Sequence, residues 1–265
     1  MDSLGKQIRF NRIINQESGK VFFVTMDHAI NRGVMPGIAN VRQTIGKLAA
    51  GGPDCLVMHK GLAREYFRPY AGKLALAIKV SAFSPYQPTY DTVVTDVEEA
   101  VSIGADAVSI GVIVGGRQQS EMLSELGRVS KAATLAGVPL IAHMYPAGEL
   151  IDKDRQHDWQ NIAYAARTGV ELGVDIVKTW YTGDPESFRK VVEATHGRVV
   201  AAGGAKADSP RQVLELTRDV MSTGALGVAY GRNIFEYKDP ANMIKALKLM
   251  IHGSGDVDEA LRILG

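Results

Sequence analysis

The sequence has 265 residues, 46% of them hydrophobic and 22% charged, and its 30 basic and 29 acidic side chains nearly cancel. This length suits either two small domains or one large α/β barrel. The even spread of charge argues against nucleic acid or an anionic membrane surface as a partner. The single cysteine, Cys55, excludes an intrachain disulfide and a multi-cysteine metal site, and we expect it to be a buried, inert thiol.

The N-terminal segment carries charges and no apolar signal core, and the sequence has no run of about 18 apolar residues. We therefore expect a cytoplasmic protein with no membrane-spanning segment.

A short pattern recurs along the chain: a small residue, a glycine, a polar residue and then an apolar run. Copies begin at Ala49, Ser102, Leu135, Glu171 and Ser222. In each copy the glycine is typical of the residue that follows a helix, and the apolar run predicts a buried parallel strand. Amphipathic segments of helical period precede the copies, at 41–48, 94–101, 121–136, 158–171 and 210–221.

Three further strands, at 21–27, 74–80 and 199–204, bring the number of predicted strands to eight. Eight strands separated mostly by helices predict an α/β fold, a single-domain (β/α)8 TIM barrel over residues 1–265. A doubly wound open sheet is the alternative, but it usually has fewer strands or a second domain. Segment 81–93 contains two prolines and two tyrosines, and we expect a loop there, either a shaped active-site loop or a simple connector.

Functional side chains of a TIM barrel gather at the carboxyl ends of its strands. The predicted strand ends here carry mostly polar residues and glycines: Asp27-His28, His59-Lys60, Ser81, Tyr145, Lys178, Gly203-Gly204 and Gly231-Arg232. This concentration predicts an active site at one mouth of the barrel.

Lys178 stands in the middle of a strand-forming run, 175–181. Burying an ammonium group without a partner is costly, and lysines are seldom fully buried. Either the side chain reaches water from the end of the strand, or it is a desolvated amine that attacks a carbonyl and forms a Schiff base. In the second case an apolar barrel wall and nearby cations such as Lys206 or Arg232 would lower its pKa.

Two glycine-containing loops follow the last two predicted strands. Gly203 and Gly204 allow a ligand to approach the backbone closely, and Gly231 precedes the guanidinium of Arg232. Loops after strands 7 and 8 form the usual phosphate site of this fold, and Arg232 could add bidentate contacts. The alternative is that the glycines only form turns and that the arginine is solvated. Because both loops show the pattern, we favour a phosphate site.

Tyr145 and Asp27 end two other predicted strands. A tyrosine at a barrel mouth can transfer a proton, although it can also serve only as an aromatic lid on the core. Asp27 could hydrogen-bond a substrate hydroxyl or hold the charge state of an amine. No set of His, Asp and Cys residues has the close spacing of a metal site. Together these residues fit Schiff-base chemistry on a phosphorylated keto sugar.

These motifs are shared with a known family. They are Met-Asp27-His28, Met-Tyr145-Pro, Val-Lys178-Thr-Trp-Tyr-Thr-Gly-Asp, Ala-Gly203-Gly204 and Gly231-Arg232-Asn-Ile-Phe. In this order they resemble the archaeal-type class I fructose-bisphosphate aldolases of the DeoC/LacD-like aldolases. The same family also contains the aminodideoxyheptulosonate synthases and the autoinducer-2 thiolase. The resemblance runs nearly from one end of the chain to the other.

The resemblance implies a role for each matching residue. It implies that Lys178 forms the Schiff base, that Tyr145 is the acid or base, and that Asp27 positions the substrate and the lysine. The implied phosphate ligands are Gly203, Gly204, Gly231 and Arg232. Further candidates for substrate contacts are His28, His59, Lys60, His143 and Lys206. The family needs no metal or organic cofactor, acts on phosphorylated sugars, and implies a homo-oligomer, either a pentamer or a decamer.

Two positions depart from the family pattern. Ala147 stands where the family often has arginine, and Ala205 stands where it often has proline. The first departure removes a possible substrate contact and bears on fructose 1,6-bisphosphate as the substrate. Segment 58–61, Met-His-Lys-Gly, is more similar to the aminodideoxyheptulosonate synthase branch, and the presence of Tyr145 argues against the thiolase branch.

We therefore predict a class I aldolase or transaldolase that cleaves or forms a carbon–carbon bond in a phosphorylated ketose. The alternatives are a transaldolase of the aminodideoxyheptulosonate synthase type, a thiolase or isomerase that uses the same phosphate site, and a non-catalytic sensor of sugar phosphates.

Overall fold

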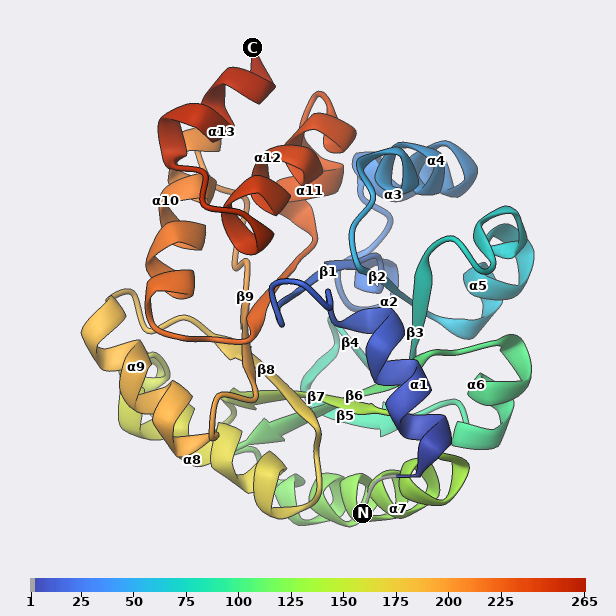
Figure 1. The fold of residues 1–265 in the computed structure, drawn as a ribbon. Helices are drawn as coiled ribbons and strands as arrows, with labels where there is room; N and C mark the ends of the chain where they lie inside the picture. The colour runs from blue at the N-terminus through green and yellow to red at the C-terminus, as the bar shows by residue number, and fades with distance from the viewer. Residues whose placement is uncertain (1–2) are drawn as a thin grey trace.

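The computed structural model describes residues 3–265, in which eight parallel strands close into a barrel (Figure 1). Their order around the barrel is β1-β10-β9-β8-β7-β6-β3-β2, and β1 pairs with both β10 and β2. Each predicted strand is present, and the predicted TIM barrel is confirmed. The strands are β1 (Val21–Thr25), β2 (Cys55–Met58), β3 (Ala75–Lys79), β6 (Ala107–Val114), β7 (Leu140–Pro146), β8 (Ile176–Trp180), β9 (Val199–Ala202) and β10 (Gly227–Tyr230).

Helices surround the barrel and connect its strands (Figure 1). They include α4 (Val41–Gly51), α5 (Lys60–Tyr66), α6 (Val97–Ile103), α7 (Gln119–Ala136), α8 (Trp159–Glu171), α9 (Pro185–Ala194), α10 (Pro210–Ser222), α12 (Pro240–His252) and α13 (Val257–Leu264). Shorter helices are α2 (His28–Arg32), α3 (Pro36–Ala39) and α11 (Arg232–Phe235), with 3-10 turns at Arg68–Tyr70 and Lys153–Arg155. Within residues 3–265, none of these helices has the length and apolar character needed to cross a membrane.

The helix predicted at 94–101 begins later than expected, at Val97. Backbone N–H groups of Val94 and Thr95 both donate to the carbonyl of Val80, at 2.8 and 3.1 Å. These bonds hold the two residues against the end of β3, so the helix starts only after Asp96. It ends at Gly104, whose left-handed φ of 99° suits a glycine, as the recurring pattern predicted.

The polar position of that pattern has a structural role at the N-terminal end of the barrel. Asp54, Asp106 and Asp175 each precede a strand and accept a backbone N–H from the neighbouring strand. The donors are Phe22, Leu76 and Leu140, at 2.6, 3.1 and 2.8 Å. The carboxylates thus connect β1 to β2, β3 to β6 and β7 to β8 at the start of each pair.

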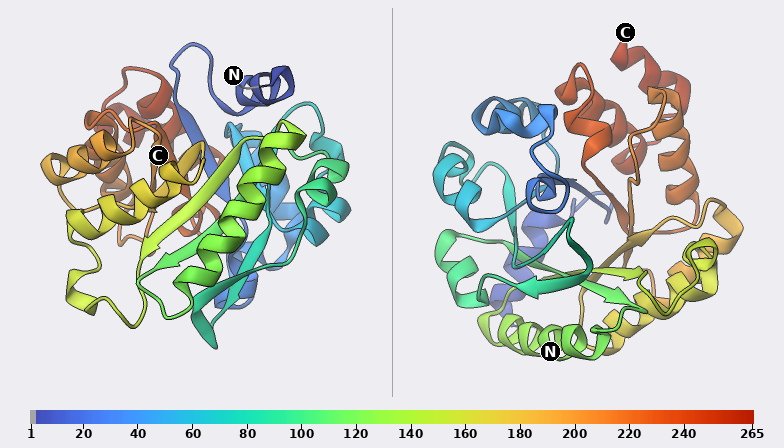
Figure 2. Two further views of the ribbon diagram at one scale, coloured as in Figure 1. Left: turned by 90° about the horizontal axis from the view of Figure 1, so that it is seen from below. Right: turned by 180° about the vertical axis from the view of Figure 1, so that it is seen from behind.

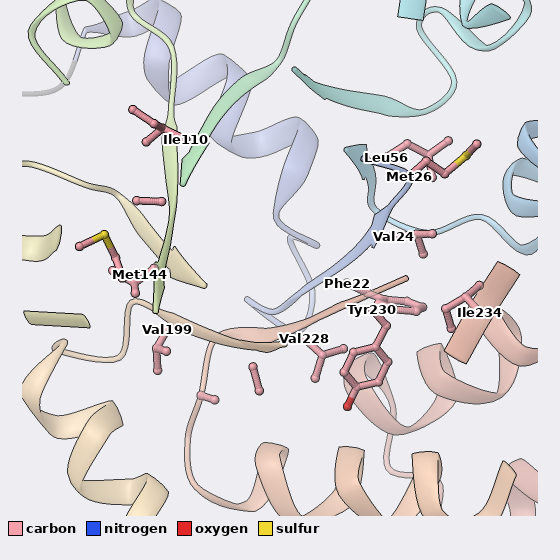
Figure 3. Packing of buried hydrophobic residues seen from close by; sticks show 14 of the residues in the cluster. Phe22, Val24, Met26, Leu56, Ile110, Met144, Val199, Val228, Tyr230 and Ile234 are labelled. Atoms are coloured by element: carbon pink, nitrogen blue, oxygen red, sulfur yellow. The ribbon is translucent and has the colours of Figure 1, made fainter. Parts of the chain in front are cut away.

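Alternating side chains of the strands form two apolar layers, one inside the barrel and one between the strands and the helices. The inner layer includes Phe23, Cys55 and Val200, and burial raises the pKa of the Cys55 thiol. Figure 3 shows part of the outer layer, where the rings of Phe22 and Tyr230 lie edge to face with centroids 6.2 Å apart.

The two ends of the barrel are covered differently. Helix α1 (Leu4–Ile13) lies across the N-terminal end, where the fully buried Ile13 joins the inner layer (Figure 2). At the opposite end, segment 81–93 forms an antiparallel hairpin of β4 (Ser81–Ser84) and β5 (Gln87–Val93), and α2 packs on β4. The prediction of a loop was therefore wrong. One proline lies at the turn and the other near the start of β5, so neither prevents the residues that follow from pairing with β4.

Candidate active site

A cavity of about 410 Å³ lies at the carboxyl ends of the strands, at the end where the β4–β5 hairpin lies. Ten of the predicted site residues line it, and they lie on or directly after six of the eight barrel strands. They are Asp27, His28, His59, His143, Tyr145, Lys178, Gly203, Gly204, Gly231 and Arg232. Fold and sequence therefore bring nearly the whole predicted site into one cavity of a size that suits a small molecule.

Lys178 lies on β8 beside His143 of β7, and its residue is only 7% exposed, so it does not reach bulk water. Burial lowers the pKa of its amine to about 8, with a further lowering by Lys79 and an opposing effect of Asp27. At pH 7 roughly a tenth of such an amine is neutral, far more than of an ordinary lysine. The cation that acts on Lys178 is Lys79 rather than Lys206 or Arg232, the two that the sequence suggested.

Asp27 follows β1 and is buried against its neighbours. Its Oδ1 lies 3.5 Å from Nδ1 of His28. Burial alone would raise the pKa of this carboxyl, but the neighbouring His28 and Lys178 outweigh burial and leave the pKa lowered. Asp27 is thus an ionised carboxylate near the amine, as required of a group that compensates a developing positive charge.

Three imidazoles line the cavity and remain neutral at neutral pH. Burial lowers the pKa of His28 to about 4 and also lowers the pKa values of His59 and His143. Nε2 of His143 lies 2.9 Å from Oγ of Ser109, and Nδ1 of His59 lies 3.2 Å from the carbonyl oxygen of Lys79. They can therefore exchange hydrogen bonds with a substrate without adding charge to the site.

Tyr145 lines the cavity from the end of β7 and stacks on Trp180, with ring centroids 5.0 Å apart and planes at 26°. Trp180 stacks in turn on His157, at 4.8 Å. Burial raises the pKa of the Tyr145 hydroxyl, so the phenol keeps its proton and is a hydrogen-bond donor at neutral pH. The stacking fixes the ring, while the hydroxyl remains on a wall of the cavity.

The glycines after β9 and β10 are required by close packing. A Cβ on Gly203 would lie 2.7 Å from the ring of Tyr230, and one on Gly231 would overlap the imidazole of His28. Gly204 has a left-handed φ of 66°, which a residue with a Cβ rarely adopts. All three glycines line the cavity, so no side chain of theirs stands between the backbone and a ligand.

Arg232 and Asn233 join the two glycine loops. The guanidinium of Arg232 donates to the carbonyl oxygen of Gly204 at 2.6 Å, and within residues 3–265 its buried Nε has no hydrogen-bond partner. The amide of Asn233 donates to the carbonyl oxygens of Gly203 and Ala205, at 2.9 and 3.2 Å. The sequence analysis missed Asn233, although it directly follows Arg232 in the shared motif. An unpaired buried Nε beside bare backbone suits an oxyanion ligand.

Two predicted contacts, Lys60 and Lys206, lie outside this cavity. Nζ of Lys60 lies 2.8 Å from Oε2 of Glu99, and Nζ of Lys206 lies 3.6 Å from Oε2 of Glu236. Both lysines are partly or largely exposed, so each ion pair lies at the surface of the barrel mouth.

Lys79 is a cavity residue that the sequence analysis missed. It ends β3 and is 3% exposed, and Nζ donates to Oγ of Ser81 at 2.6 Å and to Oδ2 of Asp91 at 3.2 Å. The sequence contained a pattern that could have identified it, because Lys79 interrupts an apolar strand just as Lys178 does. Its partner Asp91 was hidden in the segment expected to be a loop.

The charged and polar groups of the site give no metal cage. Across residues 3–265, the side chains of His, Cys, Asp and Glu form no group of three or more that could hold a metal ion. The cavity itself is lined by two amines, a carboxylate, a phenol and three imidazoles: Lys79, Lys178, Asp27, Tyr145, His28, His59 and His143.

Residues 21–237 match a protein family described as DeoC/LacD family aldolase. The chain belongs to this family. A relative from Halobacterium salinarum, 2-amino-3,7-dideoxy-D-threo-hept-6-ulosonate synthase, is 34% identical over 100% of this chain and 98% of its own. A second from Streptomyces griseus, 2-amino-4,5-dihydroxy-6-oxo-7-(phosphonooxy)heptanoate synthase, is 32% identical over 94% of this chain and 91% of its own.

Solved structures of the family agree with the fold. An archaeal fructose 1,6-bisphosphate aldolase has a TM-score of 0.86 and 29% identity, covering 94% of this chain and 100% of that one. A further archaeal fructose-1,6-bisphosphate aldolase, solved with its catalytic lysine bound covalently to the carbinolamine intermediate, has a TM-score of 0.85 and 30% identity, over 94% of this chain and 100% of that one. The predicted family and enzyme class are confirmed: the chain is an enzyme of the class I aldolase or transaldolase type.

Proposed function

We propose that the enzyme makes or breaks a carbon–carbon bond in a phosphorylated ketose through a Schiff base on Lys178. The observation that carries this proposal is the burial of Lys178, which lowers its pKa to about 8 in a cavity that also holds the glycine loops and Arg232. A neutral amine is the nucleophile that carbonyl addition needs, and a phosphate site beside it fixes the carbonyl within reach.

Binding begins at the glycine loops. The bare backbone at Gly203, Gly204 and Gly231 and the unpaired Nε of Arg232 hold the phosphate, within the cavity that Lys178 also lines. The lysine amine adds to the ketone carbon, and loss of water leaves an iminium. The carboxylate of Asp27 compensates this positive charge, which the buried site could not otherwise accommodate.

Tyr145 moves the proton at the bond that breaks or forms. Its phenol stays protonated and can donate to the oxygen of the aldehyde as this oxygen becomes a hydroxyl in condensation. Cleavage is the reverse step: Tyr145 in its phenolate form accepts the proton of the substrate hydroxyl, as microscopic reversibility requires, and the phenol so formed passes this proton to the enamine carbon or to water. The enamine left on Lys178 is then captured by a proton or by another aldehyde, which gives aldolase or transaldolase turnover.

A second candidate is a synthase reaction of the kind for which the Halobacterium and Streptomyces relatives are named, run here as a transaldol transfer. Ala147 lines the cavity where the family often carries an arginine, so position 147 itself offers no cation to a second phosphate. This observation favours a ketose with a single phosphate over fructose 1,6-bisphosphate. Assembly into a pentamer or decamer is part of the same proposal and is measured by sedimentation.

The proposal is tested by incubating the protein with a panel of phosphorylated ketoses and measuring release of triose phosphate. Borohydride added with an active ketose should leave its reduced mass on Lys178 and stop turnover, with or without EDTA. Lys178→Met is the control that should neither turn over nor be trapped. Activity that EDTA abolishes, with no adduct on Lys178, would replace the Schiff-base mechanism with a metal-dependent one.

A further inference from the structure

Lys79, Ser81 and Asp91 form a buried cluster on one wall of the cavity. The side chains of Lys79 and Asp91 are 4% and 2% exposed, and their charged atoms lie 3.2 Å apart. Ser81 accepts from Lys79 at 2.6 Å and in turn accepts the backbone N–H of Gly111 at 2.8 Å. The ammonium therefore has a fixed position, set by partners from β4, β5 and β6.

Gly111 is part of this arrangement. A Cβ at this position of β6 would overlap the carboxylate of Asp91 and lie 3.0 Å from Nζ of Lys79. Any other residue would displace the ion pair, so the absence of a side chain at Gly111 is what gives the pair its place. The space left at Gly111 is therefore needed for the Lys79–Asp91 ion pair to form.

The cluster faces the phosphate site across the cavity. In the closed barrel β3 lies four strands from β9 in either direction, while β8, with Lys178, is next to β9. Lys79, Lys178, Gly203 and Gly204 all line the same cavity. A ketose with its phosphate on the glycine loops and its carbonyl at Lys178 therefore extends its aldehyde half toward Lys79.

The wall around Lys79 has no net charge. Asp91 compensates Lys79, and the pKa values of the neighbouring imidazoles of His59 and His143 are lowered, so both are neutral. An ammonium has three N–H donors, and Ser81 and Asp91 take two of them. One donor is left for an oxygen in the cavity, while a second phosphate would lose its water against a wall whose net charge is zero.

We propose that Lys79 hydrogen-bonds an oxygen in the aldehyde half of the substrate, and that its compensated wall selects an uncharged aldehyde over a phosphorylated one. The inference rests on the proposed function, because it takes the Schiff base at Lys178 and the phosphate at the glycine loops as the other two points of contact. It deepens that function by naming the residue that contacts the aldehyde half, and it adds an independent reason for a ketose with one phosphate.

The test measures condensation of dihydroxyacetone phosphate with either glyceraldehyde or glyceraldehyde 3-phosphate, at a pH above 8, where Lys178 is mostly neutral. The wild type should give a higher kcat/KM with glyceraldehyde. Lys79→Met should raise the KM for glyceraldehyde about tenfold, the size of one lost charged hydrogen bond, and leave the KM for dihydroxyacetone phosphate unchanged. Lys248→Met is the matched control, because this lysine donates to Gly52 at the other end of the barrel and should change neither KM.

A second variant guards against misfolding, since Lys79→Met leaves the Asp91 carboxylate buried without its cation. The double variant Lys79→Met/Asp91→Asn removes both charges and should show the same loss for glyceraldehyde. A wild-type preference for glyceraldehyde 3-phosphate, or an equal rise in both KM values in the double variant, would overturn the role of Lys79. Failure of dihydroxyacetone phosphate to be trapped on Lys178 in the wild type would instead overturn the proposed function.

Discussion

Two sets of buried charges, one at each end of the barrel, differ in how completely the protein pairs them. At the N-terminal end Asp54, Asp106 and Asp175 each accept a backbone N–H and also lie within 3.0 Å of a basic side chain. These contacts join neighbouring strands and give each carboxylate both a backbone donor and a basic partner. At the C-terminal end Asp27 and Lys178 are as deeply buried, yet Asp27 makes only a loose 3.5 Å contact with His28.

This difference assigns stability to one end and chemistry to the other. A carboxylate whose partners are all within the protein has nothing left to offer a ligand, and its removal exposes unpaired partners. Burial of the Lys178 amine destabilises the fold, but the lowered pKa leaves part of the amine in its reactive, neutral form at neutral pH. Substitutions at the two ends should therefore separate turnover from folding.

The largest expected effect is on turnover in Lys178→Met, because the Schiff base has no other amine positioned to form it. We expect kcat to fall by roughly 10⁴-fold or more, the scale seen when a covalent nucleophile is lost. The melting temperature should stay near that of the wild type or rise, because the variant no longer buries an amine. Residual turnover above a hundredth of the wild type would show that another group, such as Lys79, can serve as the nucleophile.

The next effect is that of Tyr145→Phe, which removes the hydroxyl and keeps the stacked ring. We expect kcat to fall by about 10²–10⁴-fold with a much smaller change in KM, while borohydride still traps substrate on Lys178. The matched control is Tyr230→Phe, whose hydroxyl lies 3.0 Å from Oγ1 of Thr217 in the core. That variant should lose about 1 kcal/mol of stability and keep its kcat. Full kcat in Tyr145→Phe would make this tyrosine a lid only.

Arg232→Ala should act mainly on binding. Loss of a charge-assisted contact to phosphate is worth about 1.5–3 kcal/mol, which corresponds to a rise of roughly 10–100-fold in KM for a phosphorylated ketose. Arg211→Ala removes an exposed arginine of α10 that pairs with Asp258, and it should leave KM unchanged. Equal KM values for Arg232→Ala and the wild type would mean that the phosphate binds elsewhere in the cavity.

The smallest effect on turnover should come from Asp106→Ala at the N-terminal end. Asp106 accepts from Leu76 and lies 2.9 Å from Arg12, so its loss leaves a buried N–H without a partner. We expect unfolding by denaturant to show a loss of about 1–3 kcal/mol, with kcat and KM unchanged in the folded fraction. A change in kcat as large as that of Tyr145→Phe would show that the two ends are coupled.

The sequence predicted the barrel and most of the site because repeated patterns and strand ends report on them directly. Lys178, Tyr145 and the glycine loops follow recognisable strands, and the fold brings strand ends together at one mouth. The hairpin of 81–93 was missed because its prolines and tyrosines are equally typical of a loop. Asp91 lies inside that hairpin, so its pairing with Lys79, about a dozen residues earlier, depends on how β4 and β5 fold back on the barrel.

Side-chain direction was the other quantity that the sequence did not determine. His59 and Lys60 are neighbours at one strand end, yet His59 faces the cavity and Lys60 pairs with Glu99 outside it. Lys206 was likewise predicted near the amine and instead pairs with Glu236. A residue that directly follows a strand is expected at the C-terminal end of the barrel. Whether its side chain points into the cavity depends on how the following segment packs, which the sequence does not show.

The central claim is that burial lowers the pKa of Lys178 enough to give a useful fraction of neutral, nucleophilic amine near neutral pH, and the pH dependence of its trapping tests this claim most directly. Only the neutral amine adds to a carbonyl, so the initial rate of adduct formation at Lys178 should rise as pH increases and then level off. With saturating dihydroxyacetone phosphate and reductant in excess, mass spectrometry should give a midpoint at about 8. A midpoint near 10.5, the ordinary value for lysine, would contradict the claim and show an amine that the barrel has not activated.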